Sequence, residues 1–240
     1  MEYESITEQY YSKWLGVKNV KFCSGVHFVY SEERNKIPFG YSHPFNLYIF
    51  CQPQRIIVSY GDYFREMISE LKVKILPGMT AAEIKSVLNM KIGHSVKYVF
   101  DKLPGQPLCS KVLQLEDYPY YSDFYVKSNP GSESDKWLYE YFAEMVQQHT
   151  CCGVFDNDVL VSCSDAPGMP YMADKVQEIG INTLKEYRGK GYAVDACITC
   201  AKQIIRNGKC PIWSTKITNI ASQKVAEKVG FIKWAEVLTV

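Results

Sequence analysis

The sequence lacks the features that mark membrane-spanning, secreted and nucleic-acid-binding proteins. Its 240 residues contain no run of about 18 consecutive apolar residues, so we expect no transmembrane helix and no membrane partner. The formal net charge is +1, which gives no general attraction for nucleic acid. The N-terminal segment MEYESITEQYYSKW is acidic and polar, so we expect no secretory signal there and a cytoplasmic protein.

The sequence is also poor in patterns that bind metals or nucleotides. It has four histidines, and they are scattered without the spacing of a metal site. It contains no G-x-x-x-x-G-K-[ST] phosphate loop, no G-x-G-x-x-G dinucleotide fingerprint and no G-x-S-x-G nucleophile elbow. We therefore expect no metal cofactor and no serine-nucleophile chemistry.

The nine cysteines predict reduced thiols, because no export signal accompanies them. Cys197 and Cys200 form a C-x-x-C pair, but both lie on the apolar face of a helical pattern. A redox C-x-x-C precedes or opens its helix instead. We expect these two cysteines to pack in the core.

The most informative stretch runs from Glu178 to Ala193 and reads EIGINTLKEYRGKGYA. The alternation of β-branched residues over Val176–Thr183 predicts a strand. From Ala193 to Ile204, apolar residues recur at spacings of three and four, which predicts a helix. The turn between them consists of Arg188, Gly189, Lys190, Gly191, Tyr192 and Ala193.

This turn lies at the N-terminus of the predicted helix, where unpaired N–H groups and the positive end of the dipole attract anions. Its glycines let the backbone approach an anion closely, and Arg188 and Lys190 add positive charge. The alternative is an ordinary strand-to-helix turn with surface-exposed basic side chains. The turn alone does not separate the two interpretations.

Periodicity, capping residues and turn formers predict an α/β protein. The predicted helices are 4–15, 61–71, 80–90, 134–148, 194–206 and 220–228. The predicted strands are 20–30, 45–51, 55–60, 96–100, 112–115, 152–155, 159–164, 176–183, 212–215 and 231 onward. A linker at 103–107, dense in proline and glycine, divides the chain into two predicted domains, 1–105 and 106–240.

The element order after this linker, together with two motifs, resembles the GNAT N-acetyltransferase superfamily. That family's pyrophosphate signature is Arg or Gln, any two residues, Gly, any residue, and Gly or Ala, and Arg188–Ala193 fits it. Its second mark is an Asn followed by a helix that ends in Gly-Phe, and Asn219–Phe231 fits it. The resemblance covers 107–240. The layout of the whole chain is similar to the subgroup that includes zwittermicin-resistance acetyltransferases.

The resemblance implies a C-terminal mixed, mostly antiparallel sheet flanked by helices and preceded by a smaller α/β domain. It also implies acetyl transfer from acetyl-CoA to an amine of a small molecule or a protein, by direct attack on the thioester, with coenzyme A as product. The central strand and turn would bind pantetheine and pyrophosphate, and the last helix would lie beside the cofactor. The implied cofactor-binding residues are Ile181, Thr183, Arg188, Gly189, Lys190, Gly191, Tyr192, Ala193, Asn219 and Ser222.

The sequence departs from the family at the catalytic groups. Many members carry a tyrosine as general acid in the last helix, and the corresponding position here is Ala226, with Ser222 and Tyr192 as weak substitutes. Glu178 is the only carboxylate on the central strand and is the candidate base. Strict alternation would place Gln177 there instead, unless a β-bulge shifts the register. The alternative for Glu178 is a solvated carboxylate at a strand end.

Two functions therefore stay open. The first is an N-acetyltransferase, and the second is a non-catalytic sensor of acyl-CoA with the same fold, which the missing tyrosine at Ala226 keeps in consideration. We expect acceptor specificity to come from the first domain, from 118–125 and from 165–174, none of which carries a readable code. The oligomeric state is not encoded in any visible pattern.

Overall fold

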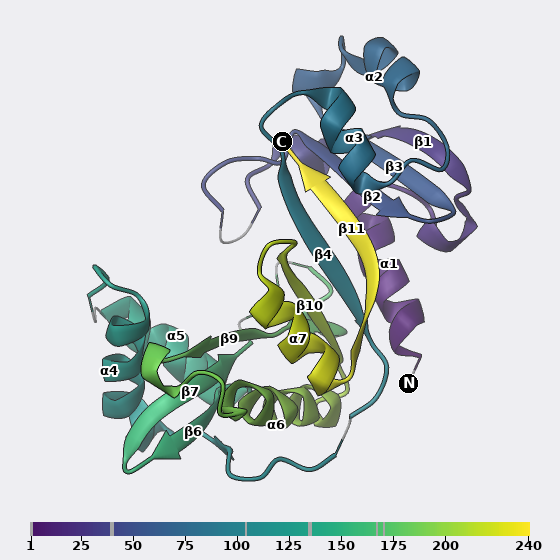
Figure 1. Ribbon diagram of the computed structural model, residues 1–240. Helices are drawn as coiled ribbons and strands as arrows, with labels where there is room; N and C mark the ends of the chain where they lie inside the picture. The colour runs from purple at the N-terminus through teal and green to yellow at the C-terminus, as the bar shows by residue number, and fades with distance from the viewer. Residues whose placement is uncertain (1, 39–40, 104, 134–135, 167, 170) are drawn as a thin grey trace. The chain divides into compact units, whose positions relative to one another are not determined.

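The computed structural model describes residues 2–38, 41–103, 105–133, 136–166, 168–169 and 171–240 (Figure 1). Its α-helices are α1 (Tyr3–Leu15), α2 (Ile68–Lys74), α3 (Ala81–Leu88), α4 (Tyr118–Ser128), α5 (Lys136–Gln147), α6 (Tyr192–Arg206) and α7 (Ile220–Val229). Its strands are β1 (Gly25–Tyr30), β2 (Leu47–Gln52), β3 (Arg55–Tyr60), β4 (Gly93–Phe100), β5 (Lys111–Val112), β6 (Cys152–Asp156), β7 (Val159–Asp165), β8 (Val176–Glu178), β9 (Gly180–Thr183), β10 (Cys210–Lys216) and β11 (Phe231–Thr239).

The predicted fold class is confirmed, because a mixed seven-stranded sheet in the order β1-β3-β2-β11-β4-β10-β8 and a four-stranded sheet β5-β6-β7-β9 are combined with helices. The chain forms two compact units. The first contains the chain up to Val99 together with 214–220 and 233–240, and the second contains 100–213 and 221–232. Neither unit is one continuous segment, and the predicted boundary between 105 and 106 stays a prediction.

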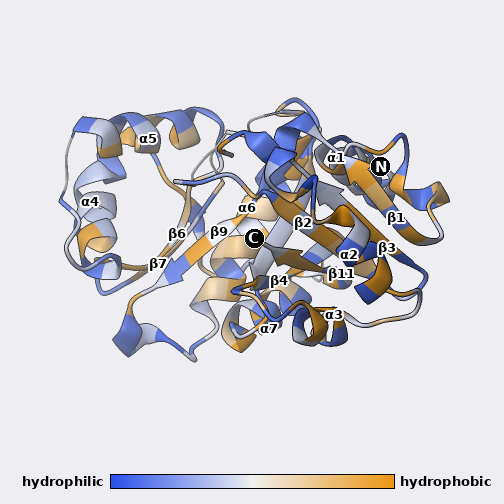
Figure 2. Ribbon diagram, turned by 90° about the horizontal axis from the view of Figure 1, so that it is seen from above, coloured by the Kyte–Doolittle hydropathy of each residue, from blue (hydrophilic) through white to orange (hydrophobic). Residues whose placement is uncertain are grey.

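The first unit has a core on each face of its sheet. Strand β2 is buried along almost its whole length, and its alternate residues point to opposite faces. Ile49 packs with the residues of α2 and α3, while Phe50 packs with Tyr11 and Leu15 of α1. Figure 2 shows α1 on one side of these strands and α3 on the other. The continuous apolar run of β2 follows from this two-sided burial.

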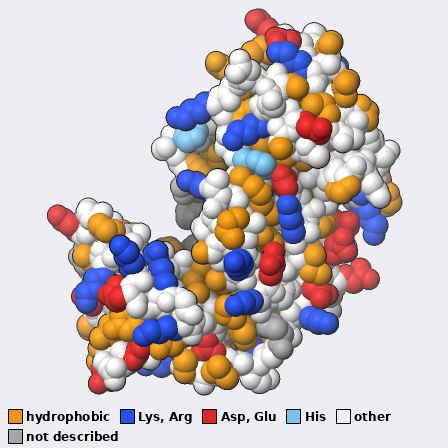
Figure 3. All heavy atoms as spheres, viewed as in Figure 1, with side chains coloured by type: hydrophobic (Ala, Val, Ile, Leu, Met, Phe, Trp, Pro, Cys, Tyr) orange, Lys and Arg blue, Asp and Glu red, His pale blue; other side chains and the backbone are white. Residues whose placement is uncertain are grey.

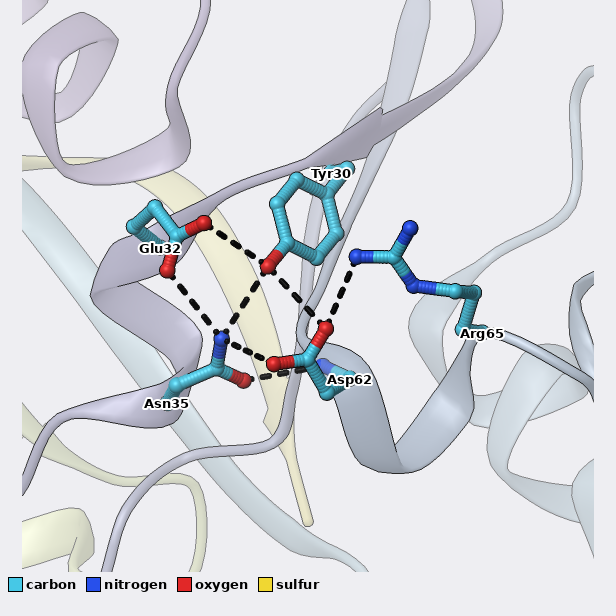
Figure 4. A network of polar contacts seen from close by, with 5 residues as sticks. All are labelled: Tyr30, Glu32, Asn35, Asp62 and Arg65. Carbon is cyan, nitrogen blue, oxygen red and sulfur yellow. Dashed lines mark hydrogen bonds and ion pairs between the residues drawn. The ribbon is translucent and has the colours of Figure 1, made fainter.

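A polar network ties together the ends of the parallel strands β1 and β3 in the first unit (Figure 4). The side-chain oxygen of Asn35 accepts the Asp62 N–H at 2.8 Å, and its amide donates back to the Asp62 carboxylate at 2.9 Å. The Tyr30 hydroxyl donates to Glu32 and to Asp62, and the Arg65 guanidinium donates to Asp62. The hydrogen bond from Arg65 is the main cause that lowers the pKa of Asp62. The polar groups of this network satisfy one another's hydrogen bonds. We therefore interpret the network as a structural link between the loop after β1 and the loop after β3.

The second unit places the sheet β5-β6-β7-β9 between helices. One face packs against α4 and α5 through Leu160, Tyr121 and Phe142. The other face packs against α6, where Val154 and Val161 contact Ala196. Asp156, Asn157 and Asp158 connect β6 to β7, which pair as an antiparallel hairpin where two strands were predicted. All nine cysteines of the chain are free thiols, and Cys197 and Cys200 are buried on α6 as expected.

Four predicted elements differ from the structure. The strand expected at 112–115 is the short β5, which ends at Val112, and a 3₁₀ turn begins at Leu115. The strand expected at 20–30 begins only at Gly25, because the Asn19 side chain accepts the Lys21 N–H and starts a 3₁₀ turn over Val20–Phe22. The helix expected at 61–71 is a 3₁₀ turn followed by α2. The strand expected at 176–183 is split between two sheets. Part of the predicted helix 134–148, at 134–135, lies outside the described residues.

Asp195, in the first turn of α6, fixes this helix to the segment before β5. Its carboxylate accepts the backbone N–H groups of Leu108, Cys109 and Ser110, and its side chain is buried. Burial alone would raise the pKa of Asp195, but these backbone hydrogen bonds outweigh it and hold the pKa below its usual value. The aspartate therefore stabilises the helix start on which the candidate site depends.

We predict that Asp195→Ala lowers the free energy of unfolding by about 2–4 kcal/mol, because three part-buried backbone N–H groups lose a charged acceptor. Since the folded-state pKa is lowered, the stabilisation is present above the unfolded pKa of about 4 and disappears as the pH falls through the folded value. Urea titrations at pH 7 and pH 3 measure both effects. Asp123→Ala, at an exposed carboxylate that pairs with Lys127 on α4, is the control and costs less than about 0.5 kcal/mol. Equal losses in the two variants would contradict the role of Asp195.

Candidate functional site

The central strand changes its partner at Ile179. Strand β8 runs parallel to β10, and the Ile179 N–H still donates to the Ile212 carbonyl at 3.1 Å. The next four residues form β9, which pairs antiparallel with β7. No strand among the described residues pairs with the other edge of β9. The break therefore leaves one edge of β9 without a strand partner among the described residues.

The backbone groups at this open edge belong to Ile181 and Thr183. The Leu184 N–H donates to the Val161 carbonyl of β7 at 2.9 Å. Antiparallel pairs alternate, so Asn182 and Gly180 also bond to β7, and the backbone groups of Ile181 and Thr183 point the other way. The Thr183 carbonyl accepts from the Arg188 Nε at 3.1 Å. The sequence placed pantetheine at these same two residues, and the geometry is compatible with that expectation.

The turn after β9 has the backbone of an anion site. Gly189 and Gly191 have φ values of 83° and 88°, and a Cβ at either position would meet no other atom within 4 Å. Gly191 is the N-cap of α6, and the first helical hydrogen bond runs from the Asp195 N–H to its carbonyl. The N–H groups of Tyr192 and Ala193 thus have no acceptor within the helix. They are available to a bound anion at the positive end of the helix dipole.

The basic residues of the turn differ in their surroundings. Lys190 and Arg188 are both exposed, but the Lys190 Nζ lies 3.8 Å from an Asp156 carboxylate oxygen in the β6–β7 hairpin. The Tyr192 hydroxyl donates to the same carboxylate at 3.0 Å. This hydrogen bond is the main cause that raises the pKa of Tyr192. Tyr192 is therefore a poor substitute for the missing general acid, and Asp156 offsets part of the positive charge of the turn.

Side chains of the last helix make contacts within the second unit. The Ser222 Oγ accepts from the Trp213 indole N–H at 3.2 Å, and Ala226 is fully buried. Ser222 lies in the same unit as the turn, whereas Asn219 lies in the other unit. The expected place of Asn219 beside the cofactor therefore stays a prediction.

The two candidates for a base on the central strand differ in burial. Gln177 is buried, and its amide donates to the Ala166 carbonyl at 2.6 Å and accepts from Lys209 at 3.0 Å. Glu178 is half-buried and immediately precedes the break at Ile179. Strict alternation along the strand would place Gln177 in the site, and a shift of register would be needed to place Glu178 there. The strand is irregular directly after Glu178, where such a shift could occur. Its catalytic role remains a prediction.

Asp165 is a residue of the site that the sequence did not identify. It is the last residue of β7 and lies opposite Gly180, at the start of β9. The Tyr141 hydroxyl donates to its carboxylate at 3.4 Å. Burial raises the pKa of Asp165 to about 6. The one available signal was its position at the first residue of the irregular stretch 165–174, directly after an alternating strand.

Within the described part of the chain, no three His, Cys, Asp or Glu side chains are grouped so as to hold a metal ion. None of the helices among these described residues is long and apolar enough to span a membrane. On the face shown in Figure 3, basic and acidic side chains are interspersed. The absence of a nucleic-acid partner stays a prediction.

Comparisons with known proteins agree with this geometry. Residues 139–237, which include β6 to α7, match the model of the family described as GNAT acetyltransferase. A GNAT-family acetyltransferase from Colwellia psychrerythraea is 18% identical with a TM-score of 0.54, over 72% of this chain and 69% of that chain. A GCN5-related N-acetyltransferase from Sphaerobacter thermophilus is 12% identical with a TM-score of 0.52, over 66% of this chain and 56% of that chain.

At these identities, the likeness to solved structures shows the fold. No curated protein matches the chain. Nothing in these comparisons supports the subgroup of zwittermicin-resistance enzymes, so that part of the resemblance stays a prediction.

We predict that the charge of Asp156 weakens anion binding at the turn. Asp156→Asn should raise the affinity for inorganic pyrophosphate by about two- to fivefold at low salt, because Lys190 loses its partner carboxylate. Lys190→Gln should lower the affinity by a similar factor. Isothermal titration calorimetry measures both. The control is Asp158→Asn, an exposed residue of the same hairpin, which should change little; an equal gain in that variant would contradict a specific effect of Asp156.

Proposed function

We propose that this protein is an acetyl-CoA-dependent N-acetyltransferase that acts on an amine of a small molecule or a protein. The observation that supports this most is the open edge of β9, which leads directly to the N-terminus of α6. One ligand that fits both features has an anionic group at one end and an extended chain with amides. Coenzyme A has this construction, and the family match over 139–237 favours it.

The chemistry of the edge and the turn fits the two parts of the cofactor. The N–H groups of Tyr192 and Ala193, with the φ-positive glycines before them, would hold the pyrophosphate. The outward N–H groups of Ile181 and Thr183 and the Ile181 carbonyl would pair with the pantetheine amides, as an added strand pairs with a sheet edge. The edge is four residues long, or about 13 Å, which gives an extended chain room to bind.

This arrangement sets the direction of the cofactor. If pyrophosphate lies at the turn that follows Thr183, the extended arm runs along β9 toward Gly180. The thioester then lies at the end of β9 where Asp165 and Glu178 are found. The carboxylates are thus placed at the reacting end of the substrate and away from the phosphates.

The cysteines of the second unit argue for direct attack by the amine. Hydrogen bonds with neighbouring thiols, together with burial, raise the pKa values of Cys151 and Cys152, and burial raises the pKa of Cys197. Cys109 is exposed, but burial of its thiol and the neighbouring Asp195 raise its pKa as well. The nucleophilic form of cysteine is the thiolate, so none of these four is activated. A direct transfer then requires only alignment of amine and thioester and a base for the amine proton.

The leaving group does not depend strongly on a tyrosine. A thiol with a pKa of about 8.5 leaves as a thiolate with little assistance near neutral pH. We therefore propose that water protonates the departing thiolate in place of the side chain missing at Ala226. The second candidate, a non-catalytic acyl-CoA sensor, is favoured by that same missing tyrosine.

We predict that Gly191→Asp weakens CoA binding by at least about tenfold, because it strains a backbone at φ 88° and places a negative charge against the pyrophosphate. Gly208→Asp is the matched control, since Gly208 has φ 74° and open space but lies after the C-terminal end of α6. Calorimetric titration with CoA compares the two. Unchanged affinity in Gly191→Asp would remove the premise shared by the enzyme and the sensor.

The enzyme and the sensor are separated by release of thiol. We predict that the protein, incubated with acetyl-CoA and a panel of primary amines, releases free CoA thiol with at least one of them, as read with a thiol reagent. The control is the same panel with Gly191→Asp. Binding of acetyl-CoA without thiol release above the control for any amine would favour the sensor.

A further inference from the structure

The carboxylate of Asp165 occupies a space that exists because residue 180 is glycine. Asp165 and Gly180 are paired between β7 and β9, and a Cβ added to Gly180 would collide with Asp165 Oδ1. Leu184, four residues along the same face of β9, packs in the core with α4 and α5. The Asp165 carboxylate therefore lies on the α4–α5 face of the sheet, at the end of β9 farthest from the anion turn.

Two tyrosine hydroxyls accompany this carboxylate. Tyr141 of α5 donates to it at 3.4 Å. Tyr121 of α4 has 1% of its surface exposed, and its hydroxyl has no hydrogen-bond partner among the described residues. A buried hydroxyl without a partner is unfavourable by about 1–3 kcal/mol and is rare in folded proteins. Burial is the main cause that raises the pKa of Tyr121, and the charge of Asp165 raises it further, so the two groups lie within electrostatic reach of each other. A polar ligand group between them would complete the hydrogen bonds.

A set of aromatic rings connects these groups to the surface. Trp137 is 46% exposed, and its ring centroid lies 6.3 Å from that of Tyr141, one helical turn further along α5. The Tyr125 ring lies 5.6 Å from Trp137 and 6.3 Å from Tyr121. The four rings thus form a continuous aromatic surface that begins at an exposed indole and ends at a half-buried carboxylate.

We propose that this cluster, Asp165 with Tyr121, Tyr125, Trp137 and Tyr141, binds the acceptor as the ammonium ion of an aryl-alkyl primary amine, and that Asp165 removes its proton. An ammonium ion is attracted both by a carboxylate and by aromatic faces, and an aryl group stacks on exposed rings. This inference rests on the proposed acetyltransferase function. It makes Asp165, the last residue of β7, the general base, for which Glu178 was the candidate from the sequence alone.

The step balances in protons and electrons. The ammonium ion gives one proton to the Asp165 carboxylate, and the neutral amine attacks the thioester carbonyl carbon. The C–N bond forms as the C–S bond breaks, and the sulfur leaves with the bonding electron pair. The second amine proton ends on the sulfur through water, which yields the amide and the CoA thiol. Asp165 returns its proton to solvent.

The surroundings of Asp165 suit this role. Groups within electrostatic reach of Asp165 are the hydroxyls of Tyr121 and Tyr141 and the thiols of Cys151 and Cys197. Burial raises the pKa values of both tyrosines and of Cys197, and a hydrogen bond with Cys163 is the main cause that raises the pKa of Cys151. These four groups are therefore neutral near pH 7. Burial raises the pKa of Asp165 to about 6, so the carboxylate is ionised at pH 7 and is a stronger base than an exposed aspartate.

The first test compares Asp165→Asn with Asp123→Asn, at an exposed carboxylate of α4, using phenethylamine and acetyl-CoA. Asp165→Asn should lower kcat by at least about 100-fold and leave the affinity for CoA unchanged, while Asp123→Asn should keep most of the activity. In the wild type, kcat/KM should rise with pH through about 6. Wild-type kcat and pH profile in Asp165→Asn would overturn the proposal. A wild-type protein that binds no CoA would instead contradict the proposed function itself.

The second test concerns the aromatic surface. Trp137 is exposed enough for Trp137→Ala to fold, and the variant should raise the KM for phenethylamine by about five- to tenfold while the KM for ethylamine changes little. Equal effects on the two amines would overturn the aryl-alkyl assignment. Activity of the wild type on other amines, with none on phenethylamine, would also overturn it and leave the acetyltransferase function standing.

Discussion

The site depends on one backbone event, the change of strand partner at Ile179. Up to that residue the chain is hydrogen-bonded to β10, and directly after it the chain is hydrogen-bonded to β7. A strand that continued beside β10 would have both edges occupied and could accept no extended ligand. Because β9 pairs with a strand on one edge alone, the outward N–H groups of Ile181 and Thr183 and the Ile181 carbonyl have no strand partner among the described residues, while the Thr183 carbonyl accepts from Arg188. The turn and α6 then place an anion site at the far end of that edge.

The four residues of β9 separate the components of the proposed reaction. Their open edge would face the proposed cofactor, and the chain after Thr183 leads to the φ-positive glycines of the turn. One face packs on α6, where Ile181 contacts the cluster around Val161 and Ala196. The other face carries Gly180, whose missing side chain leaves room for the Asp165 carboxylate. Cofactor, hydrophobic support and acceptor are thus assigned to different sides of one short strand.

Much of this was predictable from the sequence, because the signals are local. The glycines of the turn, the start of α6 and the start of the helix predicted at 80 all depend on residues within a few positions of one another, and the structure confirms their conformations. The hairpin between β6 and β7 follows the same rule. Period-2 alternation also indicated a strand at 176–183, and backbone structure of that kind is present on both sides of Ile179.

What the sequence did not show depends on contacts between distant residues. Alternation describes the side chains of one strand and says nothing of its partners, so the break at Ile179 had no signal of its own. Asp195 lies on the helix among apolar neighbours, and its role becomes visible through its bonds to Leu108–Ser110. Asp156 and Lys190 form an ion pair although they lie far apart in the sequence. Asp165 stood at the edge of an irregular stretch, and its burial results from α4 and α5.

The most direct measurement of the central claim is the change of backbone amide NMR shifts on titration of the ¹⁵N-labelled protein with CoA. If the open edge and the turn hold the cofactor, the largest changes fall on the outward amides of Ile181 and Thr183 and on the amides from Gly189 to Ala193. The inward amide of Asn182 changes less. Changes confined to other parts of the chain, with the Ile181 and Thr183 amides unmoved at saturation, would contradict the account.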